Sequence, residues 1–120
     1  AAVKAVEFVK RGYNLFMFPE GTRSRDGSLK TFKRGVGKIY LQTGAPILPV
    51  AMAGTYEMMP PGGKLQVKKK ARILIGKPQE FPKELAAAKN MNPESKAYLR
   101  LCETIAQIVE DEVRRLMAQN

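Results

Sequence analysis

The sequence contains no histidine, and this absence limits the chemistry that the chain can perform. Histidine is the side chain that most often serves as a general acid or base, because its ordinary pKa lies near neutral pH. The remaining candidate bases are carboxylates and lysines, and nothing in the pattern around them indicates a residue tuned for proton transfer. We therefore expect the chain to lack the base of an active site.

Cysteine is also scarce, and long apolar runs are missing. Cys102 is the single cysteine, which excludes an internal disulfide and fits a reducing compartment. It falls on or near the apolar face of an expected helix, so we interpret it as a small core residue rather than a nucleophile. No apolar run approaches the roughly 18 residues that a membrane-spanning helix needs. Any contact of these residues with a membrane is therefore expected at its surface.

Positive charge is abundant. The 120 residues include 21 lysines and arginines against 11 acidic residues, a net charge of +10. Such a charge predicts an anionic partner: nucleic acid, an anionic lipid surface or a phosphate-rich substrate. A nucleic-acid-binding module would interleave aromatic and basic residues on one exposed face. The four tyrosines and five phenylalanines mostly fall inside apolar runs instead, so nucleic acid is not expected as a partner.

The spacing of apolar residues predicts an α/β architecture. In the first half we expect helices over 2–11 and 34–43 and buried strands over 15–18 and 47–53. The order strand, helix, strand favours a right-handed crossover, with the two strands as parallel neighbours. Pro49 cannot donate to a ladder, which indicates an edge position, a bulge or a ladder gap.

The second half predicts a third strand and two helices. The strand covers 72–75, and a short helix covers 83–89. A long amphipathic helix then runs to Met117, with Asn92 as its N-cap and Pro93 at its first position. No strand precedes the first helix, so we expect a sheet of few strands with an exposed apolar edge or face.

The apolar run at 15–18 leads into F-P-E-G-T-R-S-R-D-G at 18–27. The Arg23 guanidinium can hold two phosphate oxygens in one plane, and Thr22 adds a hydroxyl donor. Gly21 lets the backbone turn sharply and approach a ligand closely. A surface turn with solvated arginines is the alternative, but the position directly after a buried strand favours a phosphate-binding turn.

Glu20 is interpreted as an orienting residue. The positive charge of Arg23 disfavours the protonated form of a neighbouring carboxylate. Glu20 would then stay ionised and be poorly suited to hold a proton near neutral pH. We therefore assign Glu20 to the site but not to proton transfer.

A second basic segment, F-K-R-G at 32–35, opens the helix at 34–43. Backbone N–H groups at a helix start favour anions, and Lys33 and Arg34 add charge. A solvated helix turn is about equally favoured for Arg34. A P-loop is excluded, because Gly37 and Lys38 are followed by Ile39 and the earlier glycine is missing at the required spacing.

Three motifs in this order resemble a known family. F-P-E-G-T-R-S-R-D-G resembles the third motif of the glycerolipid acyltransferases of the 1-acyl-sn-glycerol-3-phosphate O-acyltransferase type. A-P-I-L-P-V-A at 45–51 resembles their fourth motif, and F-K-R-G lies between the two. The resemblance covers about residues 1–82. The family's first motif, a histidine and an aspartate separated by four residues, is absent, as is its second.

We interpret these absences as truncation, since the sequence begins inside a helical pattern and without methionine. Residues 1–120 are then expected to be the C-terminal portion of a single acyltransferase domain. The resemblance implies an α/β fold with a mixed, largely parallel sheet covered by helices, like that of glycerol-3-phosphate acyltransferases and incomplete at the N-terminus.

The resemblance also implies the reaction. The full-length protein would transfer a fatty acyl chain from acyl-CoA or acyl-carrier protein to lysophosphatidic acid in phospholipid biosynthesis. An upstream histidine paired with an aspartate would take the proton of the glycerol hydroxyl, and the alkoxide would attack the thioester carbonyl without a covalent enzyme intermediate. Neither a metal nor a cofactor beyond the acyl donor is implied, and this chain would contribute no catalytic residue.

The resemblance assigns acceptor-phosphate and substrate binding to seven positions: Glu20, Gly21, Thr22, Arg23, Lys33, Pro49 and Val50. A plain core strand explains most side chains at 46–50. The densest basic cluster is interpreted as a solvated hairpin, or as a contact with anionic lipid or an acyl carrier; it comprises Lys64, Lys68, Lys69, Lys70 and Arg72. The protein is expected at the cytoplasmic face of a membrane with an anionic surface. A basic, non-catalytic phosphate-, lipid- or nucleic-acid-binding module remains the alternative.

Overall fold

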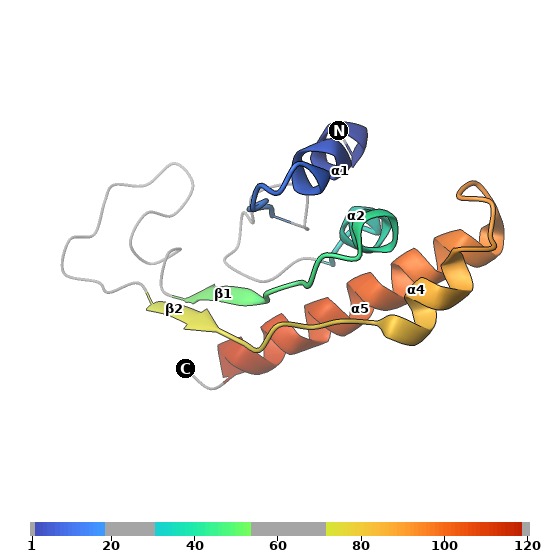
Figure 1. Cartoon of the computed structure of the whole chain (residues 1–120). Coiled ribbons are helices and arrows are strands. Elements are labelled where there is room, and N and C mark those ends of the chain that lie inside the picture. Colours follow the sequence, from blue (N-terminus) through green and yellow to red (C-terminus); the bar gives the residue numbers. More distant parts are fainter. Residues whose placement is uncertain (1, 19–30, 54–71, 119–120) are drawn as a thin grey trace, which may run out of the picture.

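The computed structural model describes residues 2–18, 31–53 and 72–118. The described elements form a helical layer with a two-stranded sheet beside it (Figure 1). In chain order these elements are α1 (Ala2–Lys10), α2 (Gly35–Thr43), β1 (Val50–Ala53), β2 (Arg72–Ile75), α4 (Pro82–Ala88) and α5 (Lys96–Ala118). The long helix α5 runs beneath both α2 and the sheet, and α1 lies on the other side of α2.

The contact between α2 and α5 is the centre of the core. The predicted apolar stripe of α5 is confirmed except at Ile108, which was expected on it but is 40% exposed; Cys102 and Ile105 are fully buried. The inward face predicted for α2 is confirmed as well, and Cys102 is a core residue as expected. Gly37 faces Cys102 so closely that a Cβ atom on Gly37 would lie 2.3 Å from the Cys102 carbonyl oxygen. A glycine is therefore required for the two helix backbones to approach to this distance.

The described sheet corrects the predicted topology. β1 and β2 are antiparallel, with Ala51 opposite Leu74. Residues 15–18 form no strand, so the expected parallel pair of 15–18 with 47–53 is wrong. A strand needs a neighbour to satisfy its backbone N–H and C=O groups, and no strand in the described part of the chain lies next to 15–18. Phe16 and Phe18 are accordingly 70% and 60% exposed.

The two strands have one buried and one exposed face. Ala51 is buried and its partner Leu74 packs against the core, because alternate residues of a strand point to the same face. On the opposite face, Ile73 and Ile75 are 68% and 64% exposed. The expectation of an exposed apolar face is therefore confirmed for the described residues. The third strand, predicted at 72–75, is confirmed as β2.

Pro49 lies immediately before β1 rather than inside it, so the second predicted strand is shorter than expected. Pro49 is buried, and its carbonyl oxygen accepts a hydrogen bond from the N–H of Gly76 at 2.9 Å. Ahead of it, Ile47 forms an isolated antiparallel bridge with Gln79. The missing N–H of Pro49 thus falls between two paired stretches, which is the predicted ladder gap.

The helix predictions hold except for one boundary. Gly12 and Gly44 have left-handed backbones with φ of 93° and 70°, as expected for glycines that end helices. Asn92 was predicted as the N-cap of the last helix, and this is wrong. Its Oδ1 accepts from Glu94 N within a separate turn, whereas the hydroxyl oxygen of Ser95 accepts from Tyr98 N and caps α5. Two capping residues stand close together here, and each caps its own turn.

Candidate functional site

The candidate site lies only partly within the described residues. Glu20, Gly21, Thr22 and Arg23 fall outside them, as do the four lysines of the basic cluster at 64–70. Lys33, Pro49 and Val50 are described. Of the candidate site, the structure therefore describes the segment that follows the phosphate-binding motif and the start of β1.

Residues 31–34 lead into α2. The two neighbours of Lys33 in this segment are both held in place. The Phe32 ring is buried in the core, and its N–H donates to Glu110 Oε1 at 2.8 Å. Arg34 has a helical backbone, and its carbonyl accepts from Lys38 N at 3.1 Å. Lys33 is exposed between these two fixed residues. Its backbone is thus ordered while its side chain is free to meet an anion.

Arg34 also approaches Glu103 on α5, with 3.7 Å between Nη1 and Oε1. Both side chains are largely exposed, so the pair contributes little to stability. This agrees with the interpretation of Arg34 as a solvated residue of the first helical turn, which the sequence left open.

Glu110 on α5 is the functional candidate that sequence reasoning missed. Its carboxylate is buried, with the residue only 5% exposed. One oxygen accepts from Phe32 N–H, and the other accepts from Arg114 Nε at 3.0 Å. The sequence contains a feature that could have identified Glu110. It lies between the core residues Val109 and Val113, four positions before an arginine. An acid beside the apolar stripe of a helix needs partners when it is buried.

The environment of Glu110 favours its ionised form. Burial alone would raise the pKa of this carboxyl, but the hydrogen bonds from Phe32 N–H and the Arg114 guanidinium outweigh burial and lower the pKa below its usual range. Glu110 is therefore negatively charged near neutral pH. It is not suited to proton transfer there.

This lowered pKa predicts how acid affects stability. A carboxylate whose pKa is lower in the folded state stabilises the fold above its unfolded pKa, about 4.5, and loses that contribution as pH falls through the folded value. Glu110→Gln should destabilise the protein by about 2 kcal/mol at pH 7, and by progressively less below pH 4.5. Urea unfolding of both proteins from pH 7 to pH 3 measures this. A difference that stays constant over that range would contradict the prediction.

The start of β1 is packed rather than open. Val50 is half-buried and pairs with Ile75, and the Pro49 carbonyl is engaged by Gly76. A Cβ atom on Gly76 would lie 3.0 Å from Pro49 Cγ and 3.2 Å from Leu116 Cδ1. The side chain of Pro49 thus packs beside Gly76, which also lies close to Leu116 of α5. Any role of Pro49 in binding would be to shape the backbone beside the site.

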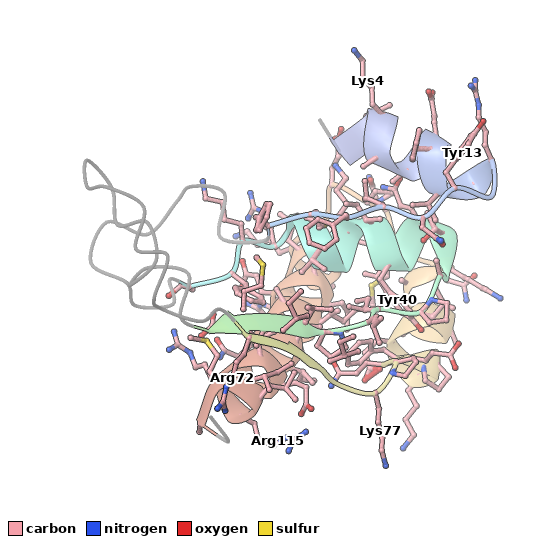
Figure 2. The ribbon with its side chains drawn as sticks, turned by 90° about the vertical axis from the view of Figure 1, so that its left-hand side faces the viewer. Lys4, Tyr13, Tyr40, Arg72, Lys77 and Arg115 are labelled. Carbon is pink, nitrogen blue, oxygen red and sulfur yellow. The ribbon has the colours of Figure 1, made fainter. Side chains whose placement is uncertain are left out.

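Basic side chains are found on opposite sides of the described part of the molecule. In Figure 2, Lys4 points away from α1 on one side of the molecule, and Lys77 points away on the opposite side. Arg72 at the start of β2 and Arg115 near the end of α5 lie in the lower part of this view, as Lys77 does. In the part of the chain that the structure describes, acidic and thiol side chains form no cluster that could hold a metal ion. No helix in that part is long and apolar enough to span a bilayer.

The comparisons with known proteins agree with the family resemblance. A family model described as Acyltransferase matches residues 1–53. The fold resembles the crystal structure of the 1-acyl-sn-glycerophosphate (LPA) acyltransferase PlsC from Thermotoga maritima, with a TM-score of 0.71 and 31% sequence identity, over 99% of this chain and 45% of that one. The chain is thus similar to the acyltransferase family, over residues 1–53 by the family model and over nearly its whole length by fold.

Relatives in this acyltransferase family come from plants and bacteria. A chloroplastic 1-acyl-sn-glycerol-3-phosphate acyltransferase of Brassica napus is 42% identical over 76 residues, which are 62% of this chain and 22% of that protein. A 1-acyl-sn-glycerol-3-phosphate acyltransferase of Borreliella burgdorferi is 46% identical over 55 residues, or 46% of this chain and 22% of that protein. The chain thus matches about a fifth of the length of these two relatives and just under half of the PlsC chain.

Proposed function

We propose that the full-length protein is a 1-acylglycerol-3-phosphate O-acyltransferase of phospholipid biosynthesis, which acylates lysophosphatidic acid. The observation that carries this proposal is the order of three motifs, at 18–27, 32–35 and 45–51, in a chain whose relatives carry that enzyme name. The donor is an acyl thioester, either acyl-CoA or acyl-carrier protein. No other cofactor and no metal is needed, because the thioester is already activated toward attack by an alkoxide.

In this proposal the chain supplies the acceptor-phosphate site. Glu20, Gly21, Thr22 and Arg23 form the phosphate-binding turn, with Arg23 as the planar donor to two oxygens. Lys33 adds a point charge from an ordered backbone beside the first turn of α2. The base that takes the proton of the glycerol hydroxyl is a histidine outside this chain, which contains none.

The full-length domain is proposed to hold a larger, mostly parallel sheet covered by helices. Two features of the described residues support this. The outer face of the two strands exposes Ile73 and Ile75, and the segment that leads into the phosphate-binding motif exposes Phe16 and Phe18. Monomeric soluble proteins rarely leave such apolar side chains together in water.

We also propose that the enzyme works at the cytoplasmic face of a membrane. Its acceptor and product are lipids, and a net charge of +10 favours an anionic lipid surface. The rival function is a non-catalytic, basic phosphate- or lipid-binding module, which the lack of histidine in this chain favours. The spread of Lys4 and Lys77 over opposite sides speaks against a nucleic-acid-binding face (Figure 2).

An assay for product formation distinguishes the acyltransferase from the non-catalytic binding module. The purified full-length protein should convert lysophosphatidic acid and an acyl thioester to phosphatidic acid, detected by mass spectrometry. The 120-residue chain alone should give no turnover above the uncatalysed rate, because it lacks a histidine base. A full-length protein that binds the acceptor but forms no product would support the binding module. Turnover by the 120-residue chain would show that the base lies within it.

A further inference from the structure

A buried carboxylate on the last helix is bonded to the backbone of the second basic motif, 78 residues earlier in the sequence. We propose that Glu110 is a positioning residue of the acceptor-phosphate site: it fixes the backbone at Phe32 and so holds Lys33 where an acceptor phosphate can meet it. This inference rests on the proposed function. It assigns a role in substrate binding to α5, outside all three motifs that carry the family resemblance.

Phe32 is attached to the core at two points. Its ring is buried in the core formed by α2 and α5, and its N–H donates to Glu110 Oε1 at 2.8 Å. Lys33 follows directly and is exposed, and α2 begins two residues later at Gly35. With Phe32 held by side chain and backbone, the Cα of Lys33 has little freedom to move. Only the side chain of Lys33 then remains to be ordered when an anion binds, which lowers the entropic cost of binding.

Glu110 is a buried charged group whose two carboxylate oxygens are both engaged. Burying a carboxylate is costly, and a neutral acceptor could equally have bonded to the Phe32 N–H. Here the two oxygens have separate partners, Phe32 N–H on Oε1 and Arg114 Nε on Oε2. The Arg114 side chain is half-exposed and comes from the next turn of the same helix. This pair sets the rotation of the carboxylate, so that Oε1 faces the amide of Phe32.

A positioning role and a purely stabilising role of Glu110 predict different kinetics. If Glu110 only stabilised the fold, its loss would lower the fraction of active enzyme and leave both Michaelis constants unchanged. If it positions Lys33, its loss should raise the KM for the phosphorylated acceptor, while the KM for the acyl donor stays the same. The two roles therefore differ in the ratio of the acceptor KM to the donor KM, and this ratio does not depend on the amount of folded protein.

The test uses the full-length enzyme and three variants. Glu110→Ala removes both contacts and should raise the acceptor KM about tenfold, as expected for one lost hydrogen bond to a charged group. Glu110→Gln keeps an acceptor for Phe32 N–H and should restore most of that loss, to within about threefold of wild type. Asp111→Asn is the matched control: it removes the same charge from an exposed neighbour that bonds to Gln107 within α5, and both constants should be unchanged.

A second measurement does not require turnover. Acetylation of Lys33 by an amine-reactive reagent, followed by peptide mass spectrometry, should be slowed by glycerol 3-phosphate in wild type and in Asp111→Asn but not in Glu110→Ala. Equal protection in Glu110→Ala, or no protection in wild type, would overturn the inference. So would an acceptor KM within twofold of wild type in the folded Ala variant. An enzyme that forms no phosphatidic acid while Lys33 is still protected would reject the proposed function alone.

Discussion

Gly37→Ala is expected to destabilise the protein by about 3 kcal/mol or more, at the upper end of the cost of overpacking a core. The new Cβ atom would lie 2.3 Å from the carbonyl oxygen of Cys102 and 2.6 Å from its Cα atom. These are backbone atoms of α5, which cannot swing aside as the end of a side chain can. The α2 and α5 helices must therefore separate, and the core between them loses its contacts.

Gly35→Ala is the matched control for this prediction. It lies on the same helix, and a Cβ atom there would meet nothing within 4 Å. Alanine is the better helix former by up to about 1 kcal/mol, so Gly35→Ala should be neutral or stabilising. Urea titrations of the three proteins measure both effects. A free energy of unfolding for Gly37→Ala equal to that of Gly35→Ala would show that the helices do not approach as described.

Arg23→Ala should lower kcat/KM for lysophosphatidic acid at least about tenfold in the full-length enzyme. Hydrogen bonds to charged groups contribute about 1.5–3 kcal/mol, and a guanidinium can make two to one phosphate. The loss should appear mainly in the use of the phosphorylated acceptor. Steady-state kinetics over a range of acceptor concentrations, at a fixed concentration of acyl donor, measure it.

Arg23→Lys is a second variant, which separates the charge of Arg23 from its planar geometry. It keeps the charge but loses the planar pair of donors, so it should recover only part of the activity. Full recovery would show that Arg23 acts through charge alone. Wild-type kinetics in Arg23→Ala would remove this residue from the site.

The helices were predictable because they depend on local patterns. The apolar spacing of α2 and α5, and Gly12 and Gly44 at helix ends, each depend on a few neighbouring residues. The N-cap of α5 was missed because Asn92 and Ser95 both have capping side chains. Which of two nearby caps starts the helix depends on the turn between them, and the sequence pattern does not specify that turn.

The sheet and part of the site were less predictable because they depend on distant partners. The run at 15–18 has the composition of a buried strand, but a strand also requires a neighbour, and the described ladder joins β1 to β2 instead. Glu110 was missed for the same reason: its role depends on Phe32, which no local pattern links to α5. The phosphate-binding residues were assigned by motif and chemistry, and because Glu20 to Arg23 lie outside the described residues, their assignment stays a prediction.

The central claim is that this chain recognises the phosphate of the acceptor in an acyl transfer. The most direct test compares kcat/KM of the wild-type full-length enzyme for lysophosphatidic acid and for a monoacylglycerol with the same acyl chain, using one acyl donor. We expect a preference of at least about tenfold for the phosphorylated acceptor. Equal kcat/KM values for the two acceptors would contradict it.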